Sequence, residues 1–381
     1  MAFLMKIDPI LAALEAQKKP RFRFLSQLPM DLPLLGGLLL LSGIAMVVLY
    51  SASGQSLDVV LRQGLRLMLA LFVMVGVAMI HPRQLANMSP ILYLVGALML
   101  ALVLLFGKIS MGAQRWLDLG IIRFQPSELT KLSTPMMIAW FMARYTPPPA
   151  VKRLFGAALL ILLPVLLIAK QPDLGTAILV GSSGAAVIFL SGISFKILAG
   201  LFVLGAGSLP LFWQFLHGYQ RDRILMLLNP EADPLGRGYH IIQSKIAIGS
   251  GGFSGKGWLH GTQVHLEFLP ESSTDFIFAV LAEEFGLIGC LGLLAAYAII
   301  LARCLYIVVQ AKDRYSRYLA GALTLTFFVY VFVNMGMVIG ILPVVGVPLP
   351  LVSYGGTSTV TLLAGFGILM SIQVHQNRQF E

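Results

Sequence analysis

Charged residues are scarce in this chain of 381 residues, because Asp, Glu, Lys and Arg together make up only 12% of it. Ordinary soluble domains carry about twice that share of charge. Hydrophobic residues make up 57% of the chain, and its mean hydropathy is +0.85. This composition excludes an ordinary soluble protein. Apolar runs that continue nearly from end to end indicate a single integral membrane domain.

Cysteine is also rare, and the motifs of several common chemistries are missing. The two cysteines, Cys290 and Cys304, lie about 21 Å apart along one predicted helix, too far for a disulfide, so we expect both to be free. His240, His260 and His265 share one loop but lack the usual spacing of metal ligands. The sequence contains no P-loop and no Ser, His and Asp in a catalytic order, so we identify no metal site and no serine-type nucleophile.

The net charge is +10, but this excess does not indicate a nucleic-acid partner. In a membrane protein, positive charge first reports topology and second indicates contact with anionic lipids or phosphate groups. We therefore expect membrane lipids, and no nucleic acid, among the partners.

About ten apolar runs are long enough to cross a bilayer core of about 30 Å. The first is longer than the apolar region of a signal peptide, so we expect it to remain as an uncleaved span. The sequence thus predicts an all-α polytopic membrane protein with about ten transmembrane helices. The predicted spans lie near residues 32–50, 61–80, 91–107, 127–143, 153–169, 174–191, 195–216, 276–305, 318–342 and 358–374.

Lys and Arg gather in the amino-terminal segment and in the loops after the fourth and eighth spans. With ten spans these three segments share one side, which the positive-inside rule identifies as cytoplasmic. We therefore predict a cytoplasmic amino-terminal segment (1–31), a single transmembrane domain (32–375) and a cytoplasmic tail (376–381).

One long extracytoplasmic loop, residues 217–275, is predicted between helices 7 and 8. Its glycines break any long helix, although the stretch IIQSKIAIG is typical of a short amphipathic helix with Lys245 on its polar side. A connection of this length in a compact domain is usually functional.

Asp275 is the leading candidate for a functional residue. It ends the long loop and begins the eighth span, in TDFIFAVLAEEFG, and a carboxylate at the mouth of an apolar helix is costly to keep there. Capping of the helix, with Thr274, is the structural alternative. Glu283 and Glu284 lie too far along the helix to pair with Asp275, so we expect them to make buried polar contacts or to be held neutral.

Two further pairs lie at the outer ends of predicted spans. Glu128 and Lys131 are three residues apart and share a helix face. They form either a structural ion pair or a polar pocket in which Lys131 meets a phosphate. Arg115 and Trp116 form either an interfacial anchor or a cation beside a stacking surface for a sugar or a lipid headgroup.

The remaining candidates lie at or near helix ends. Asp173 falls in the first turn of the sixth span, where capping and the helix dipole alone would explain a carboxylate. Gly355 and Gly356 precede the last span in LPLVSYGGTS, where hydroxyls and free backbone N–H groups would form an anion cradle. Asn334, inside the ninth span, is typical of a hydrogen bond between helices.

Several long motifs in order give the chain a resemblance to a known family. RWLDLG, FQPSE, QPDLGT, GRGYHIIQSKIAIGSGGFSGKGWLHGTQ, EFLPESSTDFIFAVLAEE and GVPLPLVSYGGTS together resemble the SEDS family (shape, elongation, division and sporulation) over about residues 32–375. KGWLHGTQ resembles its elongation members. The resemblance implies a peptidoglycan glycosyltransferase of the bacterial inner membrane that polymerises lipid II during elongation and rod-shape maintenance.

The resemblance also implies a partner and a set of site residues. The partner is a class B penicillin-binding protein, the transpeptidase that cross-links the strands. The family's essential aspartate corresponds to Asp275. The polar residues of its outer cavity correspond to Arg115, Trp116, Glu128, Lys131, Asp173, Lys245 and Ser358.

The chemistry of that reaction needs a base and positive charge. A sugar hydroxyl attacks the anomeric carbon of a muramyl sugar whose leaving group is a lipid pyrophosphate. We hypothesise Asp275 as the base, with Arg115, Lys131 and Lys245 stabilising charge on the phosphates. Alternatively, Asp275 holds a divalent cation, Mg or Mn, against the pyrophosphate; no cofactor is certain.

Two rival functions remain. A lipid II flippase would also use helices, buried carboxylates and a polar cavity, but it should line a path through both leaflets, whereas the unusual motifs cluster outside. A non-catalytic scaffold for the penicillin-binding protein would depend on its helix surface and not on the cavity residues.

Overall fold

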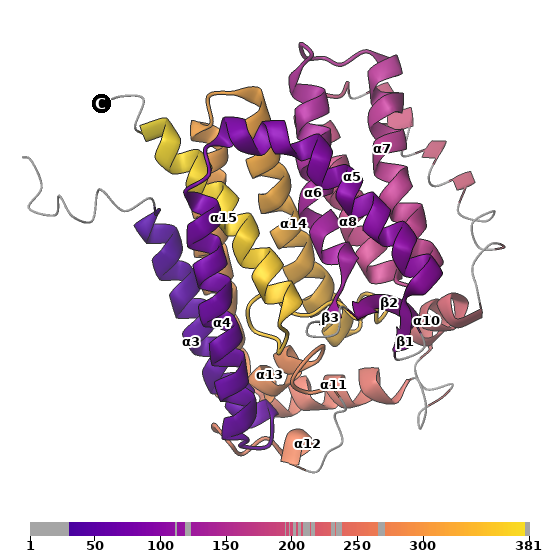
Figure 1. The fold of residues 1–381 in the computed structure, drawn as a ribbon. Coiled ribbons are helices and arrows are strands. Elements are labelled where there is room, and N and C mark those ends of the chain that lie inside the picture. The colour runs from indigo at the N-terminus through magenta and orange to yellow at the C-terminus, as the bar shows by residue number, and fades with distance from the viewer. Residues whose placement is uncertain are drawn as a thin grey trace, which may run out of the picture.

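The computed structural model describes residues 30–110, 113–118, 123–194, 218–229, 238–265 and 271–377, together with scattered positions between 196 and 214 and residue 233 (Figure 1). Most of the predicted amino-terminal segment 1–31 and of the tail 376–381 lies outside the described residues. So does most of the predicted span 195–216.

Long helices pack side by side and form the body of the protein (Figure 1). Within the described residues they are α3 (Leu32–Ala52), α4 (Leu57–Ala78), α5 (Pro82–Phe106), α6 (Pro126–Ala143), α7 (Val151–Lys170), α8 (Leu174–Leu190), α13 (Ile277–Gln310), α14 (Arg314–Ile339) and α15 (Thr357–Asn377). Seven of these helices are long and apolar enough to cross a membrane, and α8 is a shorter apolar helix.

The predicted all-α membrane fold is confirmed, and each of these helices matches a predicted span. The largest difference is at α5, which starts at Pro82 and contains Pro90 inside it, whereas the apolar run begins near residue 91. Its first two turns are polar, so hydropathy alone could not detect them. The tenth predicted span lies mostly outside the described residues, and the total of ten stays a prediction.

The most buried spans are α14 and α15, each with 67% of its apolar window inside the protein, compared with 17% for α4. The outer helices expose large apolar side chains such as Phe72 and Leu105, as expected for surfaces that face lipid. Cys290 and Cys304 are both free, as predicted.

A small antiparallel sheet, which the sequence analysis does not predict, lies between α5 and α6. It contains β1 (Lys108–Ser110), β2 (Ala113–Asp118) and β3 (Arg123–Phe124) in the order β1-β2-β3. Strands this short give too little alternation of polar and apolar residues to be detected from sequence. The sheet matters because it carries Arg115 and Trp116.

Three short helices occupy the described part of the long loop: α10 (Gly218–Leu228), α11 (Tyr239–Gly251) and α12 (Thr262–His265). The predicted amphipathic helix is α11, with Lys245 exposed. It packs against α13 and α14, and the Ser244 hydroxyl donates to the Val338 carbonyl at 2.8 Å.

Helix α13 breaks at Gly286, whose φ of 61° lies in the left-handed region. The loop after α11 fills this break through backbone hydrogen bonds, from Leu287 N to Gly252 O at 3.0 Å and from Lys256 N to Glu283 O at 3.0 Å. Backbone of this loop lies so close to Gly286 that no Cβ fits there. The break therefore needs glycine for both conformation and space.

Both carboxylates beside the break make buried polar contacts, as predicted. Glu283 is fully buried; it accepts from Lys256 Nζ at 2.6 Å and from Thr262 N at 2.9 Å. Glu284 accepts from the Ser51 hydroxyl of α3. These contacts tie the long loop and α3 to the first turns of α13, and so to Asp275 just before them.

We predict that Gly286→Ala destabilises the protein by more than about 1–2 kcal/mol, because alanine at this φ is strained and its Cβ would overlap the 253–255 backbone. Gly292→Ala, in the same helix, is the matched control. It has no neighbour within 4 Å and gains helix propensity of up to about 1 kcal/mol. In thermal denaturation in detergent, Gly286→Ala should melt at a lower temperature than the parent, and Gly292→Ala at a higher one. Equal melting temperatures would contradict this role of the break.

Candidate active site

Asp275 lies in the turn that leads into α13, and a side chain of helix α14 holds its backbone through a hydrogen bond. Asn334 is fully buried. Its side-chain amide donates to the Asp275 carbonyl at 3.0 Å and to the Val347 carbonyl at 2.8 Å. The predicted hydrogen bond between helices is therefore wrong in its partners, because Asn334 joins two connections at the end of the bundle where Asp275 lies.

The same turn is held by residues 340–356, which we call the outer loop. Tyr354 N donates to the Ser273 carbonyl at 2.8 Å, and the Ser353 hydroxyl donates to the Thr274 carbonyl. With the bridge from Asn334, successive carbonyls before α13 are all occupied. The backbone around Asp275 is thus fixed independently of its carboxylate.

The carboxylate of Asp275 does not cap α13. The cap residue is Phe276, which makes no side-chain capping bond, and the Thr274 hydroxyl donates to Glu271 at 2.7 Å. Gly346 of the outer loop, whose φ is 71°, lies beside the Asp275 carboxylate. A side chain at position 346 would bring its Cβ to 3.6 Å from Asp275 Oδ2. The capping alternative is therefore wrong, and the carboxylate lies beside glycine backbone.

Burial raises the pKa of Asp275 to about 6, and the nearby charge of Glu271 contributes to the increase. Arg223 of α10 opposes it. A carboxyl group with a pKa near neutrality is suited to take up a proton during a reaction. The surroundings of Asp275 thus match those of a general base better than those of a permanently ionised structural residue.

Glu128 and Lys131 form the predicted ion pair in the first turns of α6. The Nζ and Oε1 atoms are 2.7 Å apart, and the two side chains are 6% and 9% exposed. Lys131 Nζ also lies 5.5 Å from the centre of the Tyr330 ring on α14. The structural ion pair is therefore confirmed. Lys131 also lines a small cavity, and its contact with a phosphate stays a prediction.

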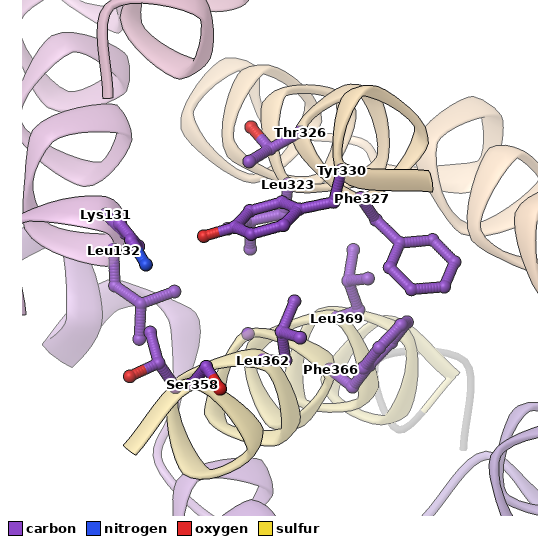
Figure 2. A pocket seen from close by; sticks show the side chains of 12 residues that line it. Lys131, Leu132, Leu323, Thr326, Phe327, Tyr330, Ser358, Leu362, Phe366 and Leu369 are labelled. Carbon is purple, nitrogen blue, oxygen red and sulfur yellow. The ribbon is translucent and has the colours of Figure 1, made fainter. Parts of the chain in front are cut away.

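That cavity, of about 40 Å³, lies between α6, α14 and α15. Figure 2 shows Lys131 and Tyr330 pointing toward one another, with Ser358 at the start of α15 beside them and apolar side chains around the rest. Ser127, Ser133 and Thr134 of α6 are buried with hydroxyls that have no partner within the described part of the chain. Buried polar atoms need partners, so the start of α6 has unused capacity for a polar ligand or water.

Arg115 and Asp173 meet at the start of α8. Arg115 Nη2 donates to the Pro172 carbonyl at 2.9 Å, and its Nε lies 3.6 Å from Asp173 Oδ2. Asp173 also caps α8 by accepting from Thr176 N at 3.3 Å. Capping thus explains part of Asp173. The Asp173 carboxylate also holds Arg115, whose side chain is 34% exposed and therefore remains accessible.

The structure does not place Trp116 and Lys245 in the cavity beside Lys131. Trp116 follows Arg115 on β2, where it is half-buried and pairs with Lys108. Successive side chains of a strand point to opposite faces, so Arg115 and Trp116 do not share one surface. Lys245 lies exposed on α11, with its side chain packed over Gly340 at the end of α14.

The sequence analysis did not assign four nearby residues to the site. Arg66 of α4 lies 4.6 Å from the centre of the Tyr354 ring, and Gln63 accepts from Gly355 N at 3.3 Å. His240 of α11 stacks on Phe276, with ring centres 5.9 Å apart. Arg223 is the fourth. A cation inside an apolar span was a signal for Arg66, whereas the other three become neighbours only through the fold.

The outer loop connects these groups. Gly175, at the start of α8, packs against the Val345 carbonyl, Gly346 against Asp275, and Gly356 against Arg66. An apolar cavity of about 220 Å³ lies between α8, α14 and this loop, lined by residues such as Ile178, Val333 and Val347. Charged groups and an apolar cavity therefore meet at one end of the bundle, as a lipid-linked substrate would require.

The described residues contain no group of three or more His, Cys, Asp and Glu side chains able to hold a metal ion. Glu271 and Asp275 are two neighbouring carboxylates. Mg²⁺ is commonly bound by one or two carboxylates together with substrate phosphates and water. These two residues therefore fit a divalent cation only in company with a phosphate-bearing substrate.

The fold and the site define a polytopic membrane protein with a polar site at one end. A sequence model of the FtsW, RodA and SpoVE family, described as cell cycle proteins, matches residues 26–378. Peptidoglycan glycosyltransferase MrdB of Escherichia coli is 57% identical over 331 residues, which cover 87% of this chain and 90% of MrdB.

Two solved structures agree with this match. A chain from a peptidoglycan synthase complex that coordinates polymerization and crosslinking superposes with a TM-score of 0.79 at 34% identity, covering 91% of this chain and 98% of that chain. Thermus thermophilus RodA superposes with a TM-score of 0.69 at 28% identity, covering 93% and 99%. The chain belongs to the FtsW, RodA and SpoVE family, which is the SEDS family that its motifs indicate.

We predict that Lys131→Met destabilises the protein by about 3–5 kcal/mol, because it leaves the buried carboxylate of Glu128 without its counter-charge. The double variant Lys131→Met/Glu128→Gln removes both charges and should recover most of the loss. Melting temperatures of the parent and both variants test this order. If the single and double variants melt together, Glu128 does not depend on Lys131.

Proposed function

We propose that the protein is a peptidoglycan glycosyltransferase that polymerises lipid II into glycan strands during cell elongation and rod-shape maintenance. It works at the outer face of the bacterial inner membrane, with both termini in the cytoplasm. The names of its relatives support the activity. The single observation that carries the mechanism is the fixed turn at Asp275, with a partly buried carboxyl group whose pKa is raised to about 6.

In the proposed reaction, Asp275 accepts the proton of the acceptor sugar's 4-hydroxyl group. The hydroxyl oxygen attacks the anomeric carbon of the muramyl sugar while that carbon's bond to the pyrophosphate breaks. The bonding electrons leave with the lipid pyrophosphate, and direct displacement inverts the anomeric carbon. Because Asn334 and the outer loop hold the backbone of this turn, the base is already oriented when the acceptor arrives.

Positive charge for the leaving pyrophosphate comes from the cations around the outer loop. Arg223 acts electrostatically on Asp275, while Arg115 is held by Pro172 and Asp173 with its side chain partly exposed. Lys131 is paired with Glu128, so its charge is offset and we assign it to orienting a substrate group. In the alternative role of Asp275, a divalent cation held by Asp275 and Glu271 would stabilise the phosphates electrostatically, and Asp275 would not be the base.

We further propose that a class B penicillin-binding protein cross-links the strands as a partner. The similar chain in a peptidoglycan synthase complex supports this. A flippase is less well supported, because the buried carboxylates deeper in α13 are already engaged: Glu283 is paired with Lys256, and Glu284 accepts from Ser51. A purely scaffolding role leaves the raised pKa and the fixed turn of Asp275 without a use.

We predict that Asp275→Asn, in the complex with the penicillin-binding partner, lowers lipid II polymerisation by about 10²–10⁴-fold, the usual contribution of a general base. Lipid II binding should persist, because the carboxylate is not needed to fix the turn. Asp58→Asn, at an exposed carboxylate 78% accessible on α4, is the control and should keep parental activity. Polymerisation at the parental rate by Asp275→Asn would exclude Asp275 as the base.

The pH dependence should identify the base more specifically. Only the ionised carboxylate accepts a proton, so the initial rate should rise with pH up to about 6, the pKa of Asp275, and then level off. Glu271→Gln removes a charge that raises this pKa, so the rise should move to lower pH. Arg223→Gln removes a charge that lowers it, so the rise should move to higher pH. Shifts in the same direction, or no shift, would contradict the assignment.

A further inference from the structure

A second polar cavity lies at the other end of the bundle from Asp275. It has a volume of about 230 Å³ and lies between the start of α5, the start of α14 and the end of α15, which meet at the upper end of Figure 1. Helix α13 runs from the turn of Asp275 to residue 310, so the cavity lies on the face that we propose to be cytoplasmic. Its polar lining residues are His81, Arg83, Lys312, Asp313, Ser316 and His375.

The charge of the cavity wall is positive. Arg83 and Lys312 are exposed, and both line the cavity. Asp313 is the opposing charge, and one of its carboxylate oxygens caps α14 by accepting from Ser316 N at 2.9 Å. The N-terminal ends of α5 and α14, where helix dipoles favour anions, both lie at this cavity.

His81 and His375 lie side by side in the same wall, and His81 adds a donor. Their ring centres are 4.7 Å apart. His81 Nδ1 accepts from Arg83 N at 3.1 Å, so the proton of this ring lies on Nε2. His375 Nδ1 lies 2.9 Å from the Ser371 carbonyl and therefore donates to it. The pKa of His81 is lowered, first by burial and then by His375 and Arg83, while Asp313 opposes the decrease.

Ser316 supplies the observation that points to a ligand. Its side chain is buried, with 1% exposure, and it lines the cavity. Its hydroxyl has no hydrogen-bond partner in the part of the chain that the structure describes. Such a hydroxyl needs a partner to offset its burial, and an acceptor bound in the cavity would provide one.

We propose that this cavity binds a phosphate group, either in the headgroup of an anionic phospholipid or in a soluble phosphate. Arg83 and Lys312 supply the charge, His81 Nε2 and the Ser316 hydroxyl supply neutral donors, and the two helix ends add their dipoles. A phosphate there would bridge α5, α14 and α15. The opposite halves of α14 and α15 carry Tyr330, Asn334 and Ser358, so the ligand would join helices that also build the active site.

The test uses the full chain in nanodiscs and two probes. In the first, discs contain phosphatidylcholine with a minority of phosphatidylglycerol, and native mass spectrometry counts the lipids that remain bound. In the second, discs contain phosphatidylcholine alone, and line broadening of inorganic phosphate in ³¹P NMR reports binding. The variants are Arg83→Gln, Lys312→Gln and Ser316→Ala, and the control is Lys152→Gln, which removes an exposed charge on α7, at the same end of the bundle.

For the parent we expect either retained phosphatidylglycerol in the first measurement or a broadened ³¹P line of inorganic phosphate in the second. The measurement that responds shows whether the ligand is a lipid headgroup or a soluble phosphate. Each of the three variants should weaken that binding by about tenfold or more, as expected for loss of one hydrogen bond to a charged ligand, and Lys152→Gln should leave it unchanged. Ser316→Ala removes no hydrogen bond to any residue that the structure describes, so it should fold normally. No response in either arm, or equal losses in Lys152→Gln, would overturn the proposal.

Discussion

The outer end of the protein depends on one buried amide. Asn334 is fully buried on α14 and donates to the carbonyls of Asp275 and Val347. Both carbonyls belong to connections that would otherwise leave polar backbone buried without a partner, which is costly. By satisfying both, Asn334 places the carboxylate of Asp275 against the outer loop before any substrate is present.

Charged groups in this membrane protein serve two different purposes. Glu283 with Lys256, and Asp31 with Arg303 at 2.7 Å, hold loops and helix ends to α13. Asp275 is different because it is only partly buried and lies among charges of both signs, and it makes no ion pair within 4 Å with any residue that the structure describes. Removing one partner of a buried ion pair leaves an uncompensated charge, so the pairs that hold α13 are needed for the stability of the fold. Groups of the second kind remain available for chemistry.

Features that lie within one helix could be predicted from local sequence patterns. The spacing of Glu128 and Lys131 determined their pairing, and IIQSKIAIG indicated α11 because both signals lie within a few turns of one helix. Asp275 was identified from the cost of a carboxylate at the mouth of an apolar span. The start of α5 was misplaced, because its polar turns extend beyond the apolar run that hydropathy detects.

Contacts between distant segments could not be predicted in this way. The pairing of Arg115 with Asp173 depends on a small sheet whose strands are too short to leave a pattern. His240 stacks on Phe276 because α11 packs against α13 and α14, and Arg223 of α10 comes close enough to affect Asp275 only in the folded chain. The partners of Asn334 were also beyond reach, because nothing near position 334 indicates that two carbonyls of other connections lie beside it. The family resemblance named the candidate residues, but it did not show that Lys131, Arg115 and Lys245 lie in different parts of the site.

The most direct test of this arrangement is lipid II polymerisation by Asn334→Leu in the complex with its penicillin-binding partner, alongside a separate measurement of lipid II binding. Leucine fills a similar volume and removes both hydrogen bonds. We predict a folded protein that binds lipid II and polymerises it about 10²-fold more slowly, because small displacements of a catalytic group have effects of that size. A folded Asn334→Leu protein with parental polymerisation would show that the position of Asp275 does not depend on this amide.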